Sequence, residues 1–314
     1  MIKHSLARLS DYFFKPISPY PLALFRILVG LCACTTLLLL HNQWLAWFGV
    51  RGWVSMETIA KAETGFRVDL FALIPHDDRW IAAFFWLLLA ASITLTAGLG
   101  TRLSTIVLYL GLNSLNQRNT LIFHGGDTLL RTVMFFLIFA PAGAALSLDR
   151  LLKLRKNHAP HTPAPPVSPW AQRLIQIQIA VVYLASFLWK LKGAPWRDGT
   201  ALYYVLHLGE IRRFPIPAFF YQPWAFHTLS WITMLFELSF PLLIWFKPFR
   251  NPLLIIGILF HLSLEYTLNL PMFQWEMLCI YPLFLNGDLI ERLSIAHPGK
   301  IKLAIRSSRE NRAL

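Results

Sequence analysis

Charged residues are scarce in this chain: Asp, Glu, Lys and Arg together make up 14% of its 314 residues. A soluble domain of this length carries about 25%. Hydrophobic residues account for 56% of the chain, and several apolar runs are long enough to cross a hydrocarbon layer of about 30 Å. The composition therefore excludes an ordinary soluble protein and predicts an all-α, polytopic integral membrane protein.

Cysteine is rare as well, with three in the whole chain. Cys32 and Cys34 lie two positions apart in one apolar run, so on a helix they point in different directions and do not pair. No CxxC motif is present, and we expect neither a structural disulfide nor a bound metal.

Acidic residues are outnumbered by basic ones, 16 against 29. The basic residues flank the apolar runs, as they do in membrane proteins. No helix-turn-helix, zinc-finger or RNA-binding pattern accompanies them. We therefore expect these basic residues to lie at the surface of the lipid bilayer, and we do not expect the protein to bind nucleic acid.

Eight membrane spans are predicted. They cover residues 22–41, 80–98, 103–120, 128–147, 173–192, 225–246, 252–270 and 273–287. The side that holds both termini carries the larger share of Lys and Arg, which predicts cytoplasmic N- and C-termini. Residues 1–292 then form a single transmembrane domain with an internal proline-rich cytoplasmic linker at 157–169, followed by a basic cytoplasmic tail at 293–314. The aromatic-rich segments 42–79 and 193–223 fall on the external side, where they are expected to fold against the membrane surface.

Ionisable side chains within apolar runs are costly, so each of them has to be explained. The positions concerned are Arg26, His124, Lys190, Glu237, His261 and Glu265. Arg26 lies near the cytoplasmic end of the first span, where its long side chain can snorkel to the surface. The others fall near external helix ends or in the external half of the bundle.

Lys190 and Lys192 end the fifth span and point to different helix faces. Snorkelling accounts for Lys192, whereas a Lys190 that faces the bundle interior would offer its neutral amine as a base. His261 and Glu265 are four residues apart and share one face, and Glu237 on the preceding span is expected to stand beside the imidazole. A polar network that only holds helices together is the alternative. A metal site is disfavoured because no compact motif such as HExxH is present.

The sequence FHGGDTLLR connects the third and fourth spans. Gly125 and Gly126 permit a sharp turn, and Asp127 suits the N-terminus of the following helix. Neither role explains His124 or Arg131. We therefore separate the turn, which is structural, from these two side chains.

Four segments stand out in order along the chain. They are HGGDTLLR…FLIFAPAGAALSLDR (124–150), YLASFLWKLKGAPWRDG (183–199), FELSFPLLIWFKPFRNPLLIIGILFHLSLEY (236–266) and MFQWEMLCIYPLF (272–284). Together they resemble the membrane domain shared by the vitamin K-dependent γ-carboxylase and the bacterial horizontally transferred transmembrane (HTTM) proteins. The resemblance covers most of residues 110–287 and is weaker over the first two spans.

The resemblance implies a membrane enzyme that acts on a reduced, vitamin K-like quinone at the external leaflet, with Lys190 as the base and His124 as its helper. The candidate catalytic residues are Lys190, His124, His261 and Glu237, and the candidate substrate- or cofactor-binding residues are Trp196, Glu265, Arg131 and Tyr183. We expect His124 to lie within reach of Lys190 in the folded bundle.

The γ-carboxylase also carries a large lumenal region for its protein substrate, and these 314 residues hold no counterpart of it. Carboxylation of glutamate therefore does not follow from the resemblance, and modification of a secreted peptide, with a partner membrane protein, is one outcome. A proton-coupled transporter that relays through Lys190, Glu237, His261 and Glu265 is the first alternative. A non-catalytic accessory protein for peptide maturation is the second. In each case we expect a multi-pass protein of the bacterial inner membrane.

Overall fold

A computed structural model describes residues 2–55, 58–59, 69–158 and 162–295. Throughout these ranges the regular structure is helical, apart from two isolated β-bridges. The long helices are α2 Tyr20–Leu40, α5 Asp78–Ala97, α6 Thr101–Arg118, α7 Gly125–Phe139, α9 Trp170–Lys192, α12 Pro223–Leu243 and α13 Lys247–Thr267. The short ones are α1 Ile2–Phe14, α3 Trp44–Phe48, α8 Leu148–Lys156, α10 Ala194–Arg197, α11 Ala201–His207, α14 Phe273–Leu278 and α15 Gly287–Ile295, with 3-10 turns η1 His41–Gln43, η2 Leu70–Leu73, η3 Thr120–Ile122, η4 Gly209–Ile211, η5 Ala218–Tyr221 and η6 Tyr281–Phe284.

The all-α membrane architecture predicted from composition is confirmed in its coarse form. Four helical segments, Tyr20–Phe48, Asp78–Ala97, Trp170–Lys192 and Pro223–Leu243, are long and apolar enough to cross a membrane. The full set of eight spans and the cytoplasmic termini stay predictions.

The last predicted span, 273–287, is not one helix. It breaks after Leu278 and continues as the 3-10 turn η6. The carbonyl of Leu283 in this irregular segment accepts hydrogen bonds from Gln172 Nε2 at 2.9 Å and Gln176 Nε2 at 2.6 Å, both on α9. Non-helical backbone in a membrane bundle needs such partners because lipid supplies none.

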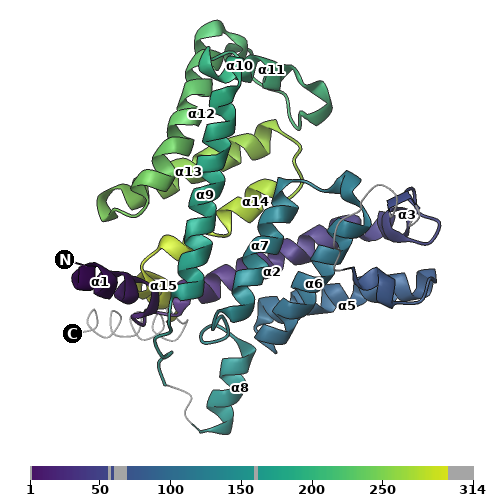
Figure 1. Cartoon of the computed structure of the whole chain (residues 1–314), viewed down its shortest axis with the longest axis vertical. Coiled ribbons are helices and arrows are strands. Elements are labelled where there is room, and N and C mark those ends of the chain that lie inside the picture. The colour runs from purple at the N-terminus through teal and green to yellow at the C-terminus, as the bar shows by residue number, and fades with distance from the viewer. Residues whose placement is uncertain (1, 56–57, 60–68, 159–161, 296–314) are drawn as a thin grey trace, which may run out of the picture.

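The helices fall into two groups that diverge from a common end (Figure 1). In the first, α2 packs along α5 and α5 packs along α6. In the second, α9 packs along α12, and α13 contacts both α12 and α14. Helix α7 contacts α6, α9 and α14, so α7 and α14 lie where the two groups meet. The polar side chains discussed below lie inside the second group and at this junction.

Arg26 does not snorkel, which corrects the interpretation from sequence. It is 0% exposed, and its guanidinium donates to the carbonyls of Ala142 at 3.0 Å, Leu146 at 2.5 Å and Thr96 at 3.4 Å. Thr96 lies in the last turn of α5, and Ala142 and Leu146 follow the end of α7. Backbone acceptors at helix C-termini lack helical partners, and a cation is favourable there. Arg26 therefore ties three helices together at one end of the bundle.

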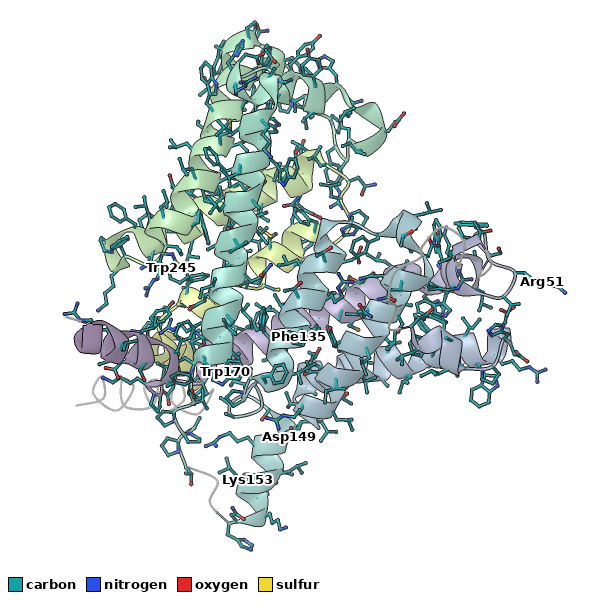
Figure 2. All side chains as sticks on the ribbon, viewed as in Figure 1. Arg51, Phe135, Asp149, Lys153, Trp170 and Trp245 are labelled. Atoms are coloured by element: carbon teal, nitrogen blue, oxygen red, sulfur yellow. The ribbon has the colours of Figure 1, made fainter. Side chains whose placement is uncertain are left out.

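Asp149, at the start of α8, closes the turn between α5 and α6. Its carboxylate accepts from the backbone N–H of Gly100 at 2.8 Å and from the N–H and hydroxyl of Thr101 at 3.0 and 2.9 Å. Figure 2 shows Asp149 and Lys153 on α8 below Trp170, far from Arg51 in the loop beyond α3. The basic residues of α8, Lys153, Arg155 and Lys156, thus lie at the same end of the molecule as the carbonyl groups that Arg26 contacts.

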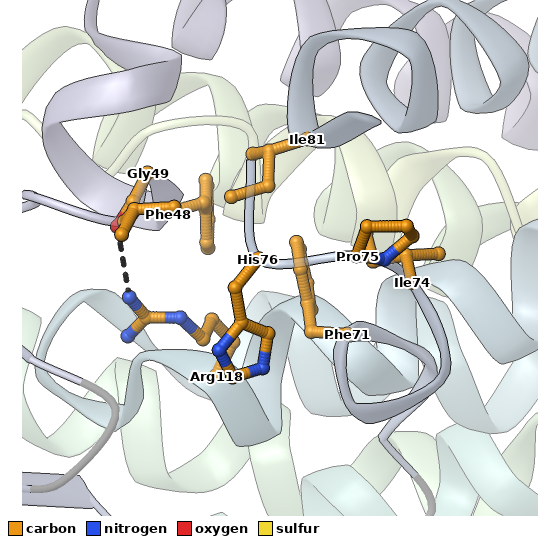
Figure 3. A pocket seen from close by; sticks show the side chains of 9 residues that line it. Phe48, Gly49, Phe71, Ile74, Pro75, His76, Ile81 and Arg118 are labelled. Atoms are coloured by element: carbon orange, nitrogen blue, oxygen red, sulfur yellow. Dashed lines mark hydrogen bonds between the residues drawn. The ribbon is translucent and has the colours of Figure 1, made fainter. Parts of the chain in front are cut away.

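The two aromatic-rich segments predicted to be external, 42–79 and 193–223, form short helices in their described parts; residues 56–57 and 60–68 of the first lie outside the described ranges. Arg118, 1% exposed at the end of α6, donates to the carbonyls of Val54 at 3.0 Å and Gly49 at 3.1 Å and so fixes the segment after α3. A small cavity of about 30 Å³ lies beside it (Figure 3). Segment 193–223 forms α10, α11, η4 and η5.

The proline-rich linker has no helix in its described parts, 157–158 and 162–169, and residues 159–161 lie outside the described ranges. Val167 instead pairs with Ile17 through backbone hydrogen bonds of 2.9 and 2.8 Å. Of the basic tail predicted at 293–314, residues 296–314 lie outside the described ranges.

Candidate functional site

One face of α9 carries the polar residues of the candidate site. Tyr183, Ser186 and Lys190 are spaced i, i+3 and i+7, so they lie above one another on the helix. The stripe extends over about 10 Å along the helix axis. Helices α12 and α13 supply the side chains that meet it, and α10 follows Lys190 at the top of Figure 1.

Lys190 is paired with Glu237 of α12. Its Nζ lies 2.5 Å from Glu237 Oε1 and donates to Ser186 Oγ at 2.7 Å. The Ser186 hydroxyl in turn donates to the same Glu237 oxygen at 2.9 Å. The Lys190 side chain is 21% exposed and that of Glu237 only 5%. The sequence placed Glu237 beside His261, and that expectation is wrong, because the lysine takes the carboxylate.

Lys190 and Lys192 point to different faces, as their spacing predicts. Lys192 is exposed, and its Nζ lies 4.1 Å from the ring centroid of Trp189, a side chain that is itself 71% exposed. Lys190 Nζ lies 5.0 Å from the ring centroid of Trp196 in α10. A cation over an indole face is attracted by the ring quadrupole. Trp196 therefore covers the ion pair from the loop side.

His261 belongs to a separate hydrogen-bonded group lower on the same face of α9. Its Nδ1 lies 2.6 Å from Gln274 Oε1, and its Nε2 lies 2.6 Å from the hydroxyl of Tyr183. Since an amide oxygen only accepts, Nδ1 carries the proton and Nε2 accepts from Tyr183. The Tyr183 hydroxyl lies 2.6 Å from that of Tyr281. These buried groups join α9, α13 and α14 through a neutral imidazole.

Glu265 shares a helix face with His261 but has other partners. Its Oε1 accepts from Arg213 in the loop after α11 and, at 3.2 Å, from Trp275 Nε1. The ion pair fastens the end of α13 to the segment 193–223. The four residues of the transporter relay, Lys190, Glu237, His261 and Glu265, thus belong to three separate groups: the Lys190–Glu237 pair, the His261 group and the Glu265–Arg213 pair.

His124 is the N-cap of α7. Its Nδ1 accepts from the N–H of Gly126 at 3.0 Å, and Asp127 Oδ2 accepts from the backbone N–H of His124 at 2.9 Å. This reciprocal arrangement is a capping box in which histidine replaces the usual Ser or Thr. Among the described residues no hydrogen bond or ion pair joins His124 to Lys190. The expected direct approach of the two side chains is therefore not present.

Arg131 connects α6 and α7. Its Nη1 donates to Asn113 Oδ1 at 3.2 Å, and its guanidinium lies 5.7 Å from the ring centroid of Phe123. These contacts are sufficient to explain why the fourth predicted span contains an arginine, and no bound ligand is needed for that explanation. Its binding role stays a prediction.

Three side chains of these groups were missed from the sequence, namely Ser186, Gln274 and Tyr281. Glu276 of α14, which is buried outside these groups, was missed as well. Ser186 precedes Lys190 by one helical turn, a spacing that would have shown it on the same face. Glu276 lies within a predicted span and should have been counted with the other intramembrane charges. Gln274 and Tyr281 carry no such signal, because uncharged polar residues in apolar segments are common.

Metal ligands do not gather in the described part of the chain: no three His, Cys, Asp or Glu side chains there are placed to hold an ion. Glu237 Oε2, by contrast, is buried without a hydrogen-bond partner. A quinol O–H is a donor that suits this free oxygen. Glu237 Oε2 is thus the atom of this site that a reduced quinone would pair with.

Taken together, the fold and this site define a polytopic helical membrane protein with a lysine–carboxylate pair shielded between two helices. The chain belongs to the HTTM domain family, which matches residues 14–288. It is thereby a membrane protein related to the γ-carboxylase. No solved structure matches the chain.

Proposed function

We propose that this HTTM protein is a membrane enzyme in which Lys190 takes a proton from a reduced quinone at the external leaflet. The observation that carries the proposal is the 2.5 Å contact between Lys190 Nζ and Glu237 Oε1, with Ser186 bonded to both atoms. An amine and a carboxylate this close exchange a proton without moving either helix.

Desolvation sets the direction of that exchange. An ion pair in a medium of low dielectric loses the hydration that stabilised its charges, so excluding water favours the uncharged pair of amine and carboxylic acid. A lipophilic cosubstrate that covers Lys190 removes the remaining water from its side chain. The proton then moves to Glu237, and the free lone pair of Lys190 becomes available as a base.

The surrounding residues have distinct tasks in this account. Ser186 keeps the two charged atoms in register, and Trp196 shields them from the aqueous side. Glu237 Oε2 accepts a hydrogen bond from the cosubstrate. A reduced quinone supplies an acidic phenolic O–H and electrons that can be passed to oxygen. Tyr183 and His261 act from below by holding α9 against α13.

The further parts of the proposal rest on the resemblance to the γ-carboxylase and go beyond what the family membership shows. The final acceptor is a secreted peptide presented at the aromatic segments 42–79 and 193–223, together with a partner membrane protein. The chemistry is of the quinol epoxidation or carboxylation type, and the protein resides in the inner membrane of a bacterium with its termini in the cytoplasm.

The test compares two lysines two residues apart. Wild-type protein in lipid nanodiscs is supplied with menaquinol under air, and oxygen uptake and quinone epoxide are measured above the rate in empty nanodiscs. Lys190→Met should lower the rate about a hundredfold or more, the usual contribution of a positioned base. Lys192→Met, the matched control, should retain the wild-type rate. A wild type no faster than empty nanodiscs, or an active Lys190→Met protein, would overturn the proposal.

A further inference from the structure

A second polar site lies where α2, α3, α6, α7 and α14 meet, and its lining includes neither Lys190 nor Glu237. The cavity has a volume of about 210 Å³. An apolar cavity of about 150 Å³ is large enough to hold benzene. Much of the wall is apolar, with Leu39, Leu40, Trp47, Leu112 and Ile122 among its residues. The space therefore suits a small organic molecule with an apolar part.

Three of the residues that line this cavity, on three different helices, carry buried polar atoms without a hydrogen-bond partner. Glu276 of α14 is 2% exposed, and neither of its carboxylate oxygens has a hydrogen-bond partner. Thr36 Oγ1 on α2 and Asn116 Nδ2 on α6 are likewise buried without partners. More than about 90% of buried polar groups in proteins are hydrogen-bonded. Their concentration around one cavity points to a ligand that pairs with them.

The ionisable residues that line the cavity determine which charge the ligand carries. Its lining holds the carboxyl groups of Glu276 and Asp127 and the imidazole of His124, and it holds no Lys or Arg. Asp127 is engaged, because it accepts from the backbone N–H of His124. Glu276 remains as a buried carboxyl group without a partner, and its charged form is stable there only beside a cation. An anionic ligand is excluded by the same reasoning.

The glycine pair of HGGD makes room for this carboxylate. A Cβ added at Gly126 would lie 2.1 Å from Glu276 Oε2 and 2.7 Å from a ring carbon of His124. Any side chain at this position would force the Glu276 carboxylate away from the start of α7. Gly126 therefore serves the cavity as well as the turn.

We propose that this cavity binds an organic ammonium ion, a primary amine with an apolar substituent. Its three N–H donors match the two oxygens of Glu276 and the hydroxyl of Thr36. The substituent packs against the apolar wall, and a hydroxyl or carbonyl oxygen on it accepts from Asn116 Nδ2. This site is independent of the chemistry proposed for Lys190.

The test is calorimetric titration of the full chain in nanodiscs, with empty nanodiscs subtracted. The probes are benzylammonium, phenylalaninol, which adds a hydroxyl, and benzyl alcohol, which has nearly the shape of benzylammonium without its charge. Wild-type protein should bind both amines and should bind benzyl alcohol about tenfold more weakly or not at all. Glu276→Gln should lower the affinity for both amines about tenfold or more. Glu210→Gln, which removes an exposed carboxylate in η4, should bind as wild type.

Thermal melting separates a binding role of Glu276 from a structural one. Glu276→Gln replaces an unpaired buried carboxyl group with an uncharged amide of nearly the same shape, so without ligand it should melt no lower than wild type. Benzylammonium should raise the melting temperature of wild type alone. Gly126→Ala, which displaces the same carboxylate, should also weaken amine binding. The proposal is overturned if wild type binds neither amine, or if benzyl alcohol binds as well as benzylammonium. It is also overturned if Glu276→Gln or Gly126→Ala binds the amines as wild type does, or if Glu276→Gln melts at a lower temperature than wild type.

Discussion

Lys190 on α9 and Glu237 on α12 form a pair whose charged atoms lie 2.5 Å apart, yet the two side chains differ in exposure, 21% against 5%. The lysine keeps a route to water, whereas the carboxylate does not. Lys192, two residues further along, is exposed and stacks on Trp189 instead. The difference in exposure governs both the stability of the pair and its chemistry.

The two single substitutions of this pair should therefore differ in their cost. Lys190→Met leaves the Glu237 carboxyl group buried without its cation and should lower the free energy of unfolding by roughly 2–4 kcal/mol. Glu237→Leu should cost only about 1 kcal/mol, because Lys190 can turn toward water. Equilibrium unfolding in mixed micelles measures both. Equal losses, or a larger loss for Glu237→Leu, would contradict the unequal burial of the partners.

Arg26 should be one of the most sensitive positions for stability. Arg26→Met leaves the carbonyls of Ala142, Leu146 and Thr96 buried without a donor, at a cost of roughly 3 kcal/mol or more. Arg26→Lys should recover only part of this, because one ammonium group lacks the fork of the guanidinium. Arg8→Met, which removes an exposed cation from α1, is the control and should unfold as wild type does. A wild-type unfolding curve for Arg26→Met would show that the carbonyls find other partners.

Gly257 on α13 tests the tyrosine–histidine group. A Cβ at this position would lie 2.2 Å from the hydroxyl oxygen of Tyr281, which itself lies 2.6 Å from that of Tyr183. Gly257→Ala should push Tyr281 out of place and lower the stability by about 1–3 kcal/mol. Gly209→Ala introduces a methyl group with nothing within 4 Å and should leave the melting temperature unchanged. A harmless Gly257→Ala would mean that α13 and η6 are packed less closely than described.

Asp149 predicts a pH dependence of stability. Burial on its own raises the pKa of this carboxyl group, but the Thr101 and Gly100 N–H donors, the Thr101 hydroxyl and the charge of Arg26 together lower the pKa below its ordinary value of 3.8. A lowered folded-state pKa stabilises the fold above the ordinary value, and the stabilisation is lost as the pH falls through the lowered value.

Asp149→Asn should accordingly lower the stability by about 1 kcal/mol at neutral pH, a small figure because the carboxylate is largely solvated. The melting temperatures of wild type and Asp149→Asn should begin to approach each other as the pH falls below about 4, and they should meet only below the lowered pKa of Asp149. A difference that stays constant down to pH 3 would assign the loss to hydrogen-bond geometry instead of charge.

The sequence was sufficient to predict the helical membrane class, because apolar runs and the flanking charges are local features. It also separated Lys190 from Lys192, since their directions follow from helix geometry alone. The interruption of the last span was not predicted. Residues 273–287 are apolar enough to pass for one span, and the Gln172 and Gln176 contacts that stabilise the broken backbone come from a distant helix.

Pairing between helices was the part that sequence could not supply. Glu237 had two possible partners, His261 and Lys190, on different helices, and the rotation of α12 decides between them. His124 was expected beside Lys190 because their helix ends fall on the same side of the membrane and because the resemblance to the γ-carboxylase implies a role for it beside that lysine. The packing of α14 against α7 places it at the cavity of Glu276 instead. Glu276 itself was overlooked in an apolar stretch that seemed to need no explanation.

The central claim is that Lys190 and Glu237 act as one proton-exchanging unit, and a double-mutant cycle on the menaquinol-dependent rate of oxygen uptake tests it most directly. Wild type, Lys190→Met, Glu237→Gln and the double variant are compared in nanodiscs at a temperature where all four remain folded. Residues that act as a unit have strongly non-additive effects, so the double variant should be no slower than Lys190→Met alone. A double variant whose loss equals the product of the two single losses would contradict the claim.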